Sequence, residues 1–216
     1  MGCICVKQKI VDDYKEHPQT VLAAQTFFTE KDVRSLYDLF KKLSSCIIHK
    51  DFITKEELQL GLFQNSKRQS LFIDRIFSLF DMNNDGIIEF NEFVLSLNTF
   101  HPDTSQEEKA AFVFRLYGLR ETGFIEHEDI KEMTLALMEE SDMILTDEIV
   151  EAIINKTFEE ADMKGDGKID IEEWQVFAAK NPSILKNMTI PYLKDITMGF
   201  PSFVQKQDVF EDEIYN

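Results

Sequence analysis

One twelve-residue segment carries oxygen atoms at regularly spaced positions and a glycine at its sixth position. The oxygens belong to the side chains of Asp81, Asn83, Asp85 and Glu92 and to the backbone carbonyl of Ile87. A calcium ion takes about six to eight such oxygens in flexible geometry, and this spacing is that of an EF-hand loop. Gly86 permits the left-handed bend that a side chain would oppose. We therefore predict a calcium site at Asp81–Glu92.

A second segment, from Asp162 to Glu173, repeats the pattern with one fault. The expected ligands are Asp162, Asp166, the carbonyl of Lys168, and Glu173. Lys164 stands at the third position, where it has no acceptor atom and adds a positive charge. Water can replace the missing oxygen. We predict that this loop also binds calcium, more weakly than the loop at Asp81.

Another loop, Gly118–Asp129, has the glycine of the sixth position but lacks side-chain oxygens at the first and third positions, where Gly118 and the cation Arg120 stand. Its weaker candidate ligands are Gly118, Thr122 and Asp129. The alternative is a loop kept for pairing with its neighbour through Ile125 and Ile169.

The remaining candidate loop lies nearest the N-terminus and is longer than the others. Ile53 and Glu57 fit the eighth and twelfth positions, and counting from Ser44 makes fourteen residues rather than twelve. His49, Lys50 and Asp51 stand where acidic residues and a glycine would be expected. Such a loop can still bind calcium through backbone carbonyls, with Ser44 and Glu57 as weaker candidate ligands.

Helices must flank these loops, because each loop follows one amphipathic segment and precedes another. Apolar residues recur at helical spacing after Thr29, from Ser70 to Phe80, after a Ser105–Glu108 capping box, and after Thr146. The loops close at Glu57, Glu92, Asp129 and Glu173, at spacings of 35, 37 and 44 residues. We predict an all-α protein with four EF-hand units in two lobes: an N-terminal pair at 26–100, a C-terminal pair at 105–180, and an apolar C-terminal extension at 181–216.

Composition narrows the classes of function. The chain has 216 residues, with 23 Lys and Arg against 40 Asp and Glu, and a net charge of −17. This balance disfavours nucleic acid and suits cations or a basic partner peptide. The three cysteines form no disulfide framework, and no apolar run is long enough to span a bilayer. Cys46 with His49 is a poor nucleophile–base pair, so we predict no catalytic residues and no enzyme.

Residues 1–25 are interpreted as a targeting segment. Met1-Gly2-Cys3-Ile4-Cys5-Val6 nearly matches the N-myristoylation pattern, with Val6 in place of the expected Ser or Thr. Gly2 is therefore a candidate for myristoylation, and Cys3 and Cys5 are candidates for palmitoylation. One myristoyl chain alone binds a membrane only marginally, so stable anchoring needs the second signal.

The whole pattern resembles the plant calcineurin B-like calcium sensors. The likeness rests on the fourteen-residue loop, the loop spacings, the start Met-Gly-Cys, and the strings Phe114-Arg-Leu-Tyr117, Lys186-Asn-Met-Thr-Ile-Pro-Tyr-Leu-Lys-Asp195 and Phe200-Pro-Ser-Phe203. The resemblance implies an all-α fold of the calcineurin B and neuronal calcium sensor type, with Ca²⁺ as its ion. It also implies a hydrophobic groove that holds the regulatory segment of a calcineurin B-like-interacting Ser/Thr protein kinase, which is thereby activated.

The resemblance further implies that the kinase phosphorylates Ser202 and is recruited to the cytoplasmic face of a membrane, with the plasma membrane as the first expectation. Without acylation the protein would be partly cytoplasmic or nuclear. Two other functions remain open: a calcineurin B-type regulatory component of a phosphatase, and a passive calcium buffer that does not open on binding the ion. The Phe-Pro-Ser-Phe tail favours the kinase over the phosphatase.

Overall fold

The computed structural model describes residues 18–47, 50–63, 71–140 and 145–188, and this part of the chain is all-helical. Its elements are α2 (Pro18–Gln25), α3 (Glu30–Leu43), α4 (Lys55–Phe63), α5 (Leu71–Phe80), α6 (Phe90–Asn98), α7 (Gln106–Tyr117), α8 (His127–Glu140), α9 (Asp147–Ala161), α10 (Ile171–Lys180) and the 3-10 helix η1 (Pro182–Met188). The predicted all-α fold class is confirmed. No helix in these ranges has the length and apolar character needed to cross a membrane.

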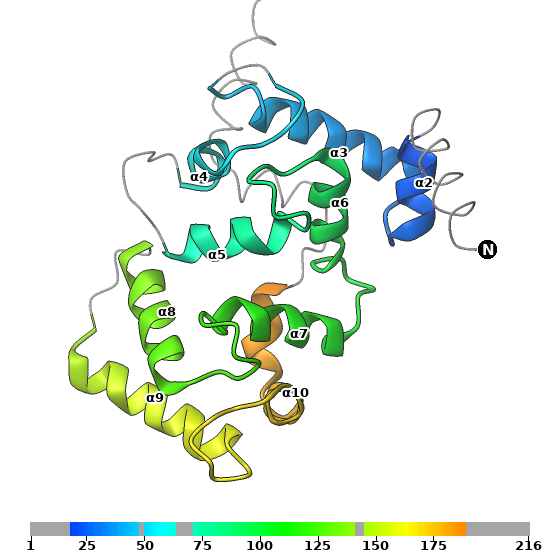
Figure 1. Ribbon diagram of the computed structural model, residues 1–216. Coiled ribbons are helices and arrows are strands. Elements are labelled where there is room, and N and C mark those ends of the chain that lie inside the picture. The colour runs from blue at the N-terminus through cyan, green and yellow to red at the C-terminus, as the bar shows by residue number, and fades with distance from the viewer. Residues whose placement is uncertain (1–17, 48–49, 64–70, 141–144, 189–216) are drawn as a thin grey trace, which may run out of the picture.

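The helices form four helix–loop–helix units, α3–α4, α5–α6, α7–α8 and α9–α10, with the first two in the upper part of Figure 1 and the last two in the lower part. Each pair of units is joined by a short antiparallel bridge between its loops. Ile53 and Ile88 exchange two backbone hydrogen bonds of 2.9 Å, and Ile125 and Ile169 exchange bonds of 2.8 and 3.0 Å. The pairing of Ile125 with Ile169, which the sequence offered for the loop at Gly118, is present, and the Ile53–Ile88 bridge is its counterpart in the other pair.

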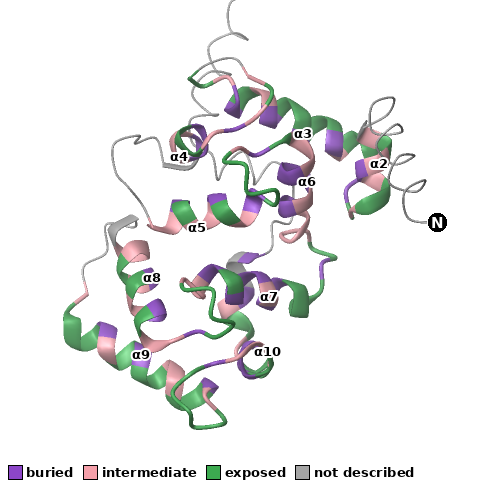
Figure 2. Ribbon diagram, in the orientation of Figure 1, coloured by how far each residue is buried: buried purple, intermediate pink, exposed green. Residues whose placement is uncertain are grey.

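Helix α3 begins where its sequence predicts. The Thr29 hydroxyl accepts a hydrogen bond from the Asp32 amide, and the Asp32 carboxylate accepts one from the Thr29 amide at 3.0 Å. This reciprocal capping box satisfies two amides that the helix cannot pair internally. Ser105 likewise accepts from the Glu108 amide at the start of α7. The apolar stripe of α3 then faces the core, as Figure 2 shows by the buried residues along that helix.

Helix α2 lies within the segment that we interpreted as targeting sequence. Its Leu22 is completely buried, and the helix packs against α3 and α6. Just after it, the Phe27 amide donates to Asn98 Oδ1 at 2.8 Å, and the rings of Phe28 and His101 pack in a T-shaped pair. Residues 18–25 therefore belong to the folded body of the protein, whereas 1–17 lie outside the described residues.

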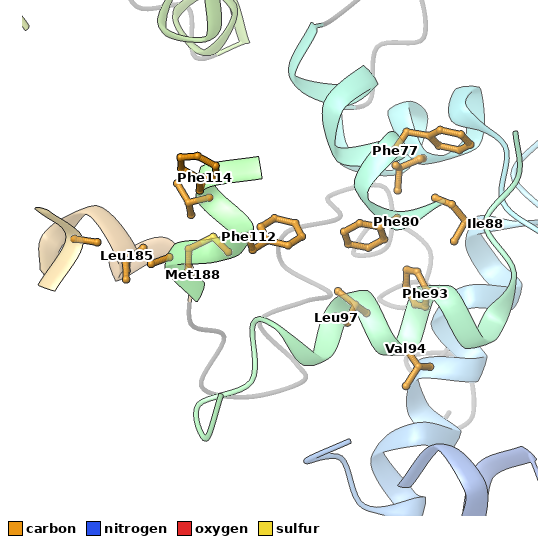
Figure 3. Packing of buried hydrophobic residues seen from close by; sticks show 14 of the residues in the cluster. Phe77, Phe80, Ile88, Phe93, Val94, Leu97, Phe112, Phe114, Leu185 and Met188 are labelled. Atoms are coloured by element: carbon orange, nitrogen blue, oxygen red, sulfur yellow. The ribbon is translucent and has the colours of Figure 1, made fainter. Parts of the chain in front are cut away.

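A continuous hydrophobic cluster runs through both lobes. Figure 3 shows Phe80 of α5 and Leu97 of α6 on the side of the core that Phe112 of α7 approaches. The turn between the lobes, His101–Thr104, holds a buried Thr104 whose hydroxyl donates to the Asn98 carbonyl at 2.5 Å. The lobes thus share one core.

The C-terminal extension starts on the surface of the second lobe. Helix η1 packs against α7 and α10, with Leu185 and Met188 buried there (Figure 3). The rest of the extension, including Ser202, lies outside the described residues, as do Gly2, Cys3 and Cys5.

Candidate metal sites

The loop from Asp81 to Glu92 is built around the buried carboxylate of Asp81. This residue follows the last residue of α5, and its two oxygens accept the amides of Asp85 at 3.1 Å and Gly86 at 2.9 Å. Gly86 has φ +83°, a conformation that L side chains rarely adopt. The first, fifth and sixth positions of the predicted loop are therefore folded around one carboxylate.

The other end of this loop is closed by Glu92, in the first turn of α6. Its side chain is buried, and its oxygens accept the amides of Asn83 at 3.0 Å and Glu89 at 2.8 Å. Glu92 and Asp81 thus connect α6 to α5 through the loop backbone. Glu92 is thus placed at the closing end of the loop, where an EF-hand takes its twelfth-position ligand.

All four loops are closed by the same kind of contact. In chain order, the first loop ends at Glu57, the second at Glu92, the third at Asp129 and the fourth at Glu173. The amide three residues before each final carboxylate donates to it, and these bonds measure 3.0 Å for Thr54–Glu57, 2.8 Å for Glu89–Glu92, 2.9 Å for Glu126–Asp129 and 3.0 Å for Asp170–Glu173. All four final carboxylates are buried. The four units therefore share one loop framework, although their other positions differ.

Glu57 supplies a direct test of whether the first loop fits a cation. One carboxylate oxygen accepts from the amide and hydroxyl of Thr54, and the other, Oε1, is buried without a hydrogen-bond partner among the described residues. A buried carboxylate oxygen without a partner is costly, and a cation would satisfy it. Ser44 is also buried, but its hydroxyl donates back to the Lys41 carbonyl at 3.3 Å. Glu57 fits the predicted ligand role, while the Ser44 hydroxyl is already engaged.

The fourth loop, from Asp162 to Glu173, repeats the framework of the loop at Asp81. Asp162 accepts the amides of Gly165 at 2.7 Å and Gly167 at 2.8 Å, and Glu173 accepts the Lys164 amide at 2.9 Å. Two of the predicted ligands, Asp162 and Glu173, are therefore placed as Asp81 and Glu92 are. Asp166, the third side-chain ligand, bonds the Lys168 amide at 3.0 Å within the same loop.

Lys164 itself makes an ion pair inside this loop. Its ammonium group hydrogen-bonds the Asp170 carboxylate, which raises the pKa of Lys164 and lowers that of Asp170. A cation entering this loop must therefore tolerate or displace an ammonium group that already neutralises one carboxylate. The structure gives a physical reason for the predicted weaker binding at this loop.

Charged side chains also form ion pairs in the first and third loops, which lack some of the usual ligand residues of an EF-hand. Lys41 of α3 pairs with Asp51 in the first loop, and Arg120 pairs with Asp129 in the third. Within the described residues, no three His, Cys, Asp or Glu side chains converge on one point. Calcium binding by this protein must therefore draw on amide, hydroxyl and backbone carbonyl oxygens in addition to carboxylates, as it does in EF-hands.

Two sets of hydrogen bonds between residues far apart in the chain were not predicted from the sequence. The Arg75 guanidinium of α5 donates to the carbonyls of Arg115 at 2.6 Å and Gly118 at 3.0 Å, so one lobe is bonded to the start of a loop in the other. Trp174 donates to the Ala110 carbonyl at 2.9 Å. Neither set has a local sequence signal, because each joins residues that are far apart in the chain.

The similarity of this chain to known proteins agrees with this geometry. A model of the EF-hand domain pair matches residues 49–98, and a model of the EF hand matches residues 154–178. Calcineurin B-like protein 5 of Arabidopsis thaliana is 52% identical over 95% of this chain and 100% of its own length. The type 2 calcineurin B protein of Dictyostelium discoideum is 33% identical, over 69% of this chain and 77% of its own. Calcium and integrin-binding family member 2 of Homo sapiens is 31% identical, over 76% of this chain and 89% of its own. With paired EF-hand loops and a relative of this identity along nearly its whole length, the chain belongs to the calcineurin B-like family of calcium-binding EF-hand proteins.

Proposed function

We propose that this protein is a calcium sensor that binds and activates a calcineurin B-like-interacting Ser/Thr protein kinase. The observation that carries the proposal is the full-length relationship to Calcineurin B-like protein 5. The structure supports it with a framework at Asp81–Glu92 that fits calcium and connects two helices. We propose Asp81, Asn83, Asp85, Ile87 and Glu92 as ligands there, and Asp162, Asp166, Lys168 and Glu173 as ligands in the fourth loop.

The proposed switch acts through helix orientation. When bound, calcium would supply positive charge to the oxygens of a loop, and the residues that hold it would fix the angle between the two flanking helices. Asp81 directly follows α5, and Glu92 lies in the first turn of α6, so drawing these two carboxylates together reorients one helix against the other. The Ile53–Ile88 bridge then transmits the change to the first loop, because its two hydrogen bonds link the loop backbones.

An amphipathic partner segment is the kind of ligand that such a switch would bind. Three aliphatic side chains on the contacting helices α8 and α9 are exposed: Leu135 at 38%, Ile149 at 46% and Ile153 at 44%. Ile149 and Ile153 lie one turn apart, which is the spacing that a helix-in-groove contact uses. The net charge of −17 would favour basic flanks on the partner.

The C-terminal extension is proposed to compete with the partner for apolar surface. Its first part already packs on α7 and α10, beside a cavity of about 250 Å³ lined in part by Ala110, Ala178 and Leu185. A chain ending after Met188 keeps the buried η1 contacts and removes only the residues beyond them. We expect this truncation to bind the partner more tightly than the full chain, and unchanged or weaker binding would count against the competition.

Membrane recruitment forms the second half of the proposal. Gly2, Cys3 and Cys5 would carry the acyl groups. Ser202 would be the phosphorylation site, and a phosphate charge near −2 between the two neighbouring phenylalanines would alter docking. Intact-mass analysis of protein from eukaryotic cells tests acylation, with Gly2→Ala as the control. The absence of any acyl mass would refute the membrane claim for this chain.

Kinase activation is tested with the purified full chain and a purified kinase of the named class. We expect binding and stimulation of kinase activity in calcium, and much weaker effects in a chelator or with the Glu92→Gln, Glu173→Gln double variant. Equal binding with and without calcium would refute the sensor mechanism. Calcium-dependent exposure of apolar surface, measured with a dye, separates a sensor from a passive buffer.

A phosphatase regulatory role is the second candidate. It is favoured by the 33% identity to the type 2 calcineurin B protein over 69% of this chain. Competition between a kinase regulatory segment and the catalytic chain of a phosphatase for this protein distinguishes the two. Preferential capture of the phosphatase chain would reverse our choice.

A further inference from the structure

The third loop holds a cationic side chain of its own where its neighbours would hold an ion. Arg120 stands at the third position of that loop, and its guanidinium bonds two carboxylates. One nitrogen pairs with Asp129 Oδ1 at the twelfth position, and another bonds Glu132 Oε1 of α8 at 2.6 Å. Asp129 is completely buried. A buried carboxylate requires a counter-charge, and the planar guanidinium fork is well suited to bridging two of them.

The other two predicted ligands of this loop, Gly118 and Thr122, are also engaged. The Gly118 carbonyl, at the first position, accepts the Arg75 guanidinium at 3.0 Å. The Thr122 hydroxyl, at the fifth position, donates to the Phe124 carbonyl of the seventh position at 3.3 Å. Each predicted ligand of the loop therefore already has a partner that the protein itself provides.

The loop nevertheless keeps the EF-hand backbone. Gly123 has φ +82°, close to the +83° of Gly86 at the same position of the second loop. Asp129 accepts the Glu126 amide through its second oxygen, and Ile125 is paired with Ile169 of the fourth loop. The third loop therefore differs from an ion-binding loop in the charges of its side chains, whereas its backbone follows the same path.

We infer that the guanidinium of Arg120 takes the place of the calcium ion in the third loop, so that this hand is folded and closed to calcium at every calcium concentration. The calcium response of the second pair then comes from the fourth loop alone. The third loop serves as a fixed partner, whose Ile125 backbone holds Ile169 in register. This inference concerns the internal structure of the pair and does not depend on which protein the chain binds.

Nuclear magnetic resonance on the full chain tests whether the third loop responds to calcium. The amides of Gly86 and Gly167 donate to Asp81 and Asp162, the first residues of their loops, so they should shift strongly when those carboxylates bind calcium. Gly123 holds the same position in the third loop, which by our inference takes up no ion, and we therefore expect its amide to change little. A calcium-induced shift of the Gly123 amide as large as those of Gly86 and Gly167 would overturn the inference.

Removal of the guanidinium provides a second readout that needs no calcium. Arg120→Met leaves Asp129 buried without its cation, and we expect the melting temperature in chelator to fall by roughly 5 °C. Adding Asp129→Asn should restore part of the loss, because the unpaired charge is then absent. The matched control, Arg34→Met on exposed α3 surface, should change the melting temperature by less than about 1 °C. No loss in Arg120→Met, or no recovery in the double variant, would contradict the role.

A gain of ion binding completes the test. Arg120→Asp removes the cation and places a carboxylate at the third position, so native mass spectrometry in calcium should count one more bound ion than in the unchanged chain. Asp129→Asn should leave the count of the unchanged chain unaltered. A lower count in Asp129→Asn would show that the third loop binds calcium, and would refute the substitution by Arg120.

Discussion

Replacing Lys164 by asparagine tests how a single cation sets the calcium affinity of the fourth loop. The second loop carries Asn83 at the same position, so the change gives the fourth loop the residue type that the second loop has there. In the structure the Lys164 ammonium is bonded to Asp170, and its side chain is 52% exposed. Lys164→Asn removes that charge and supplies an amide oxygen. The fourth loop should therefore bind calcium more tightly.

The magnitude follows from the exposure of the side chain. Because half of it is in contact with water, the charge is strongly screened, and its repulsion of a divalent ion costs on the order of 1.4 kcal/mol, which is about tenfold in Kd. The added oxygen acts in the same direction. We expect the calcium Kd of the fourth loop to fall by about tenfold or more, with a smaller effect at high salt, which screens exposed charges.

Trp174 provides the assay. It is the only tryptophan of the chain, it directly follows Glu173, and it is buried with its indole nitrogen bonded to the Ala110 carbonyl. Calcium titrations followed by its fluorescence should show the shift in Kd. Lys156→Asn, on the exposed face of α9, is the matched control and should leave Kd unchanged. If Lys164→Asn titrates like the unchanged chain, the charge at the third position does not control affinity and the reasoning fails.

Three further outcomes are expected. Phe93→Ala should lower the free energy of unfolding by about 3–5 kcal/mol in denaturant titrations, because Phe93 is fully buried; a loss below about 1 kcal/mol would contradict its place in the core. Gly86→Ala should cost about 1 kcal/mol in the same assay, since φ is +83° and no atom lies within 4 Å of an added Cβ, so backbone strain acts alone; equal stability would refute that strain. Lys131 hydrogen-bonds Glu151 and lowers its pKa, so the stability from this pair is present above the ordinary value of 4.5 and is lost as pH falls through the lowered pKa. Lys131→Met should return the pKa of Glu151, followed by nuclear magnetic resonance, toward 4.5, and an unchanged pKa would exclude Lys131 as the cause.

The helices that flank the loops and the second loop itself were predictable from local sequence. Caps such as Thr29 and Ser105 act within four residues, and helical spacing identifies the buried face of α3 without knowledge of its partners. The loop from Asp81 to Glu92 is similarly self-contained, since its spacing and Gly86 determine a local backbone path. Local interactions of this kind are encoded in neighbouring residues, so a single sequence is enough to read them.

Contacts between distant residues were decided only by the tertiary structure. The sequence shows that Arg120 is a cation in a degenerate loop, but not that its guanidinium meets Asp129 and Glu132. It does not show that Arg75 bonds the Gly118 carbonyl across the lobes, nor that α2 packs into the body. Residue types determined which loops have oxygens to offer a cation. Packing determined which of those oxygens the protein's own cations already hold, because that depends on where long side chains reach after the helices have assembled.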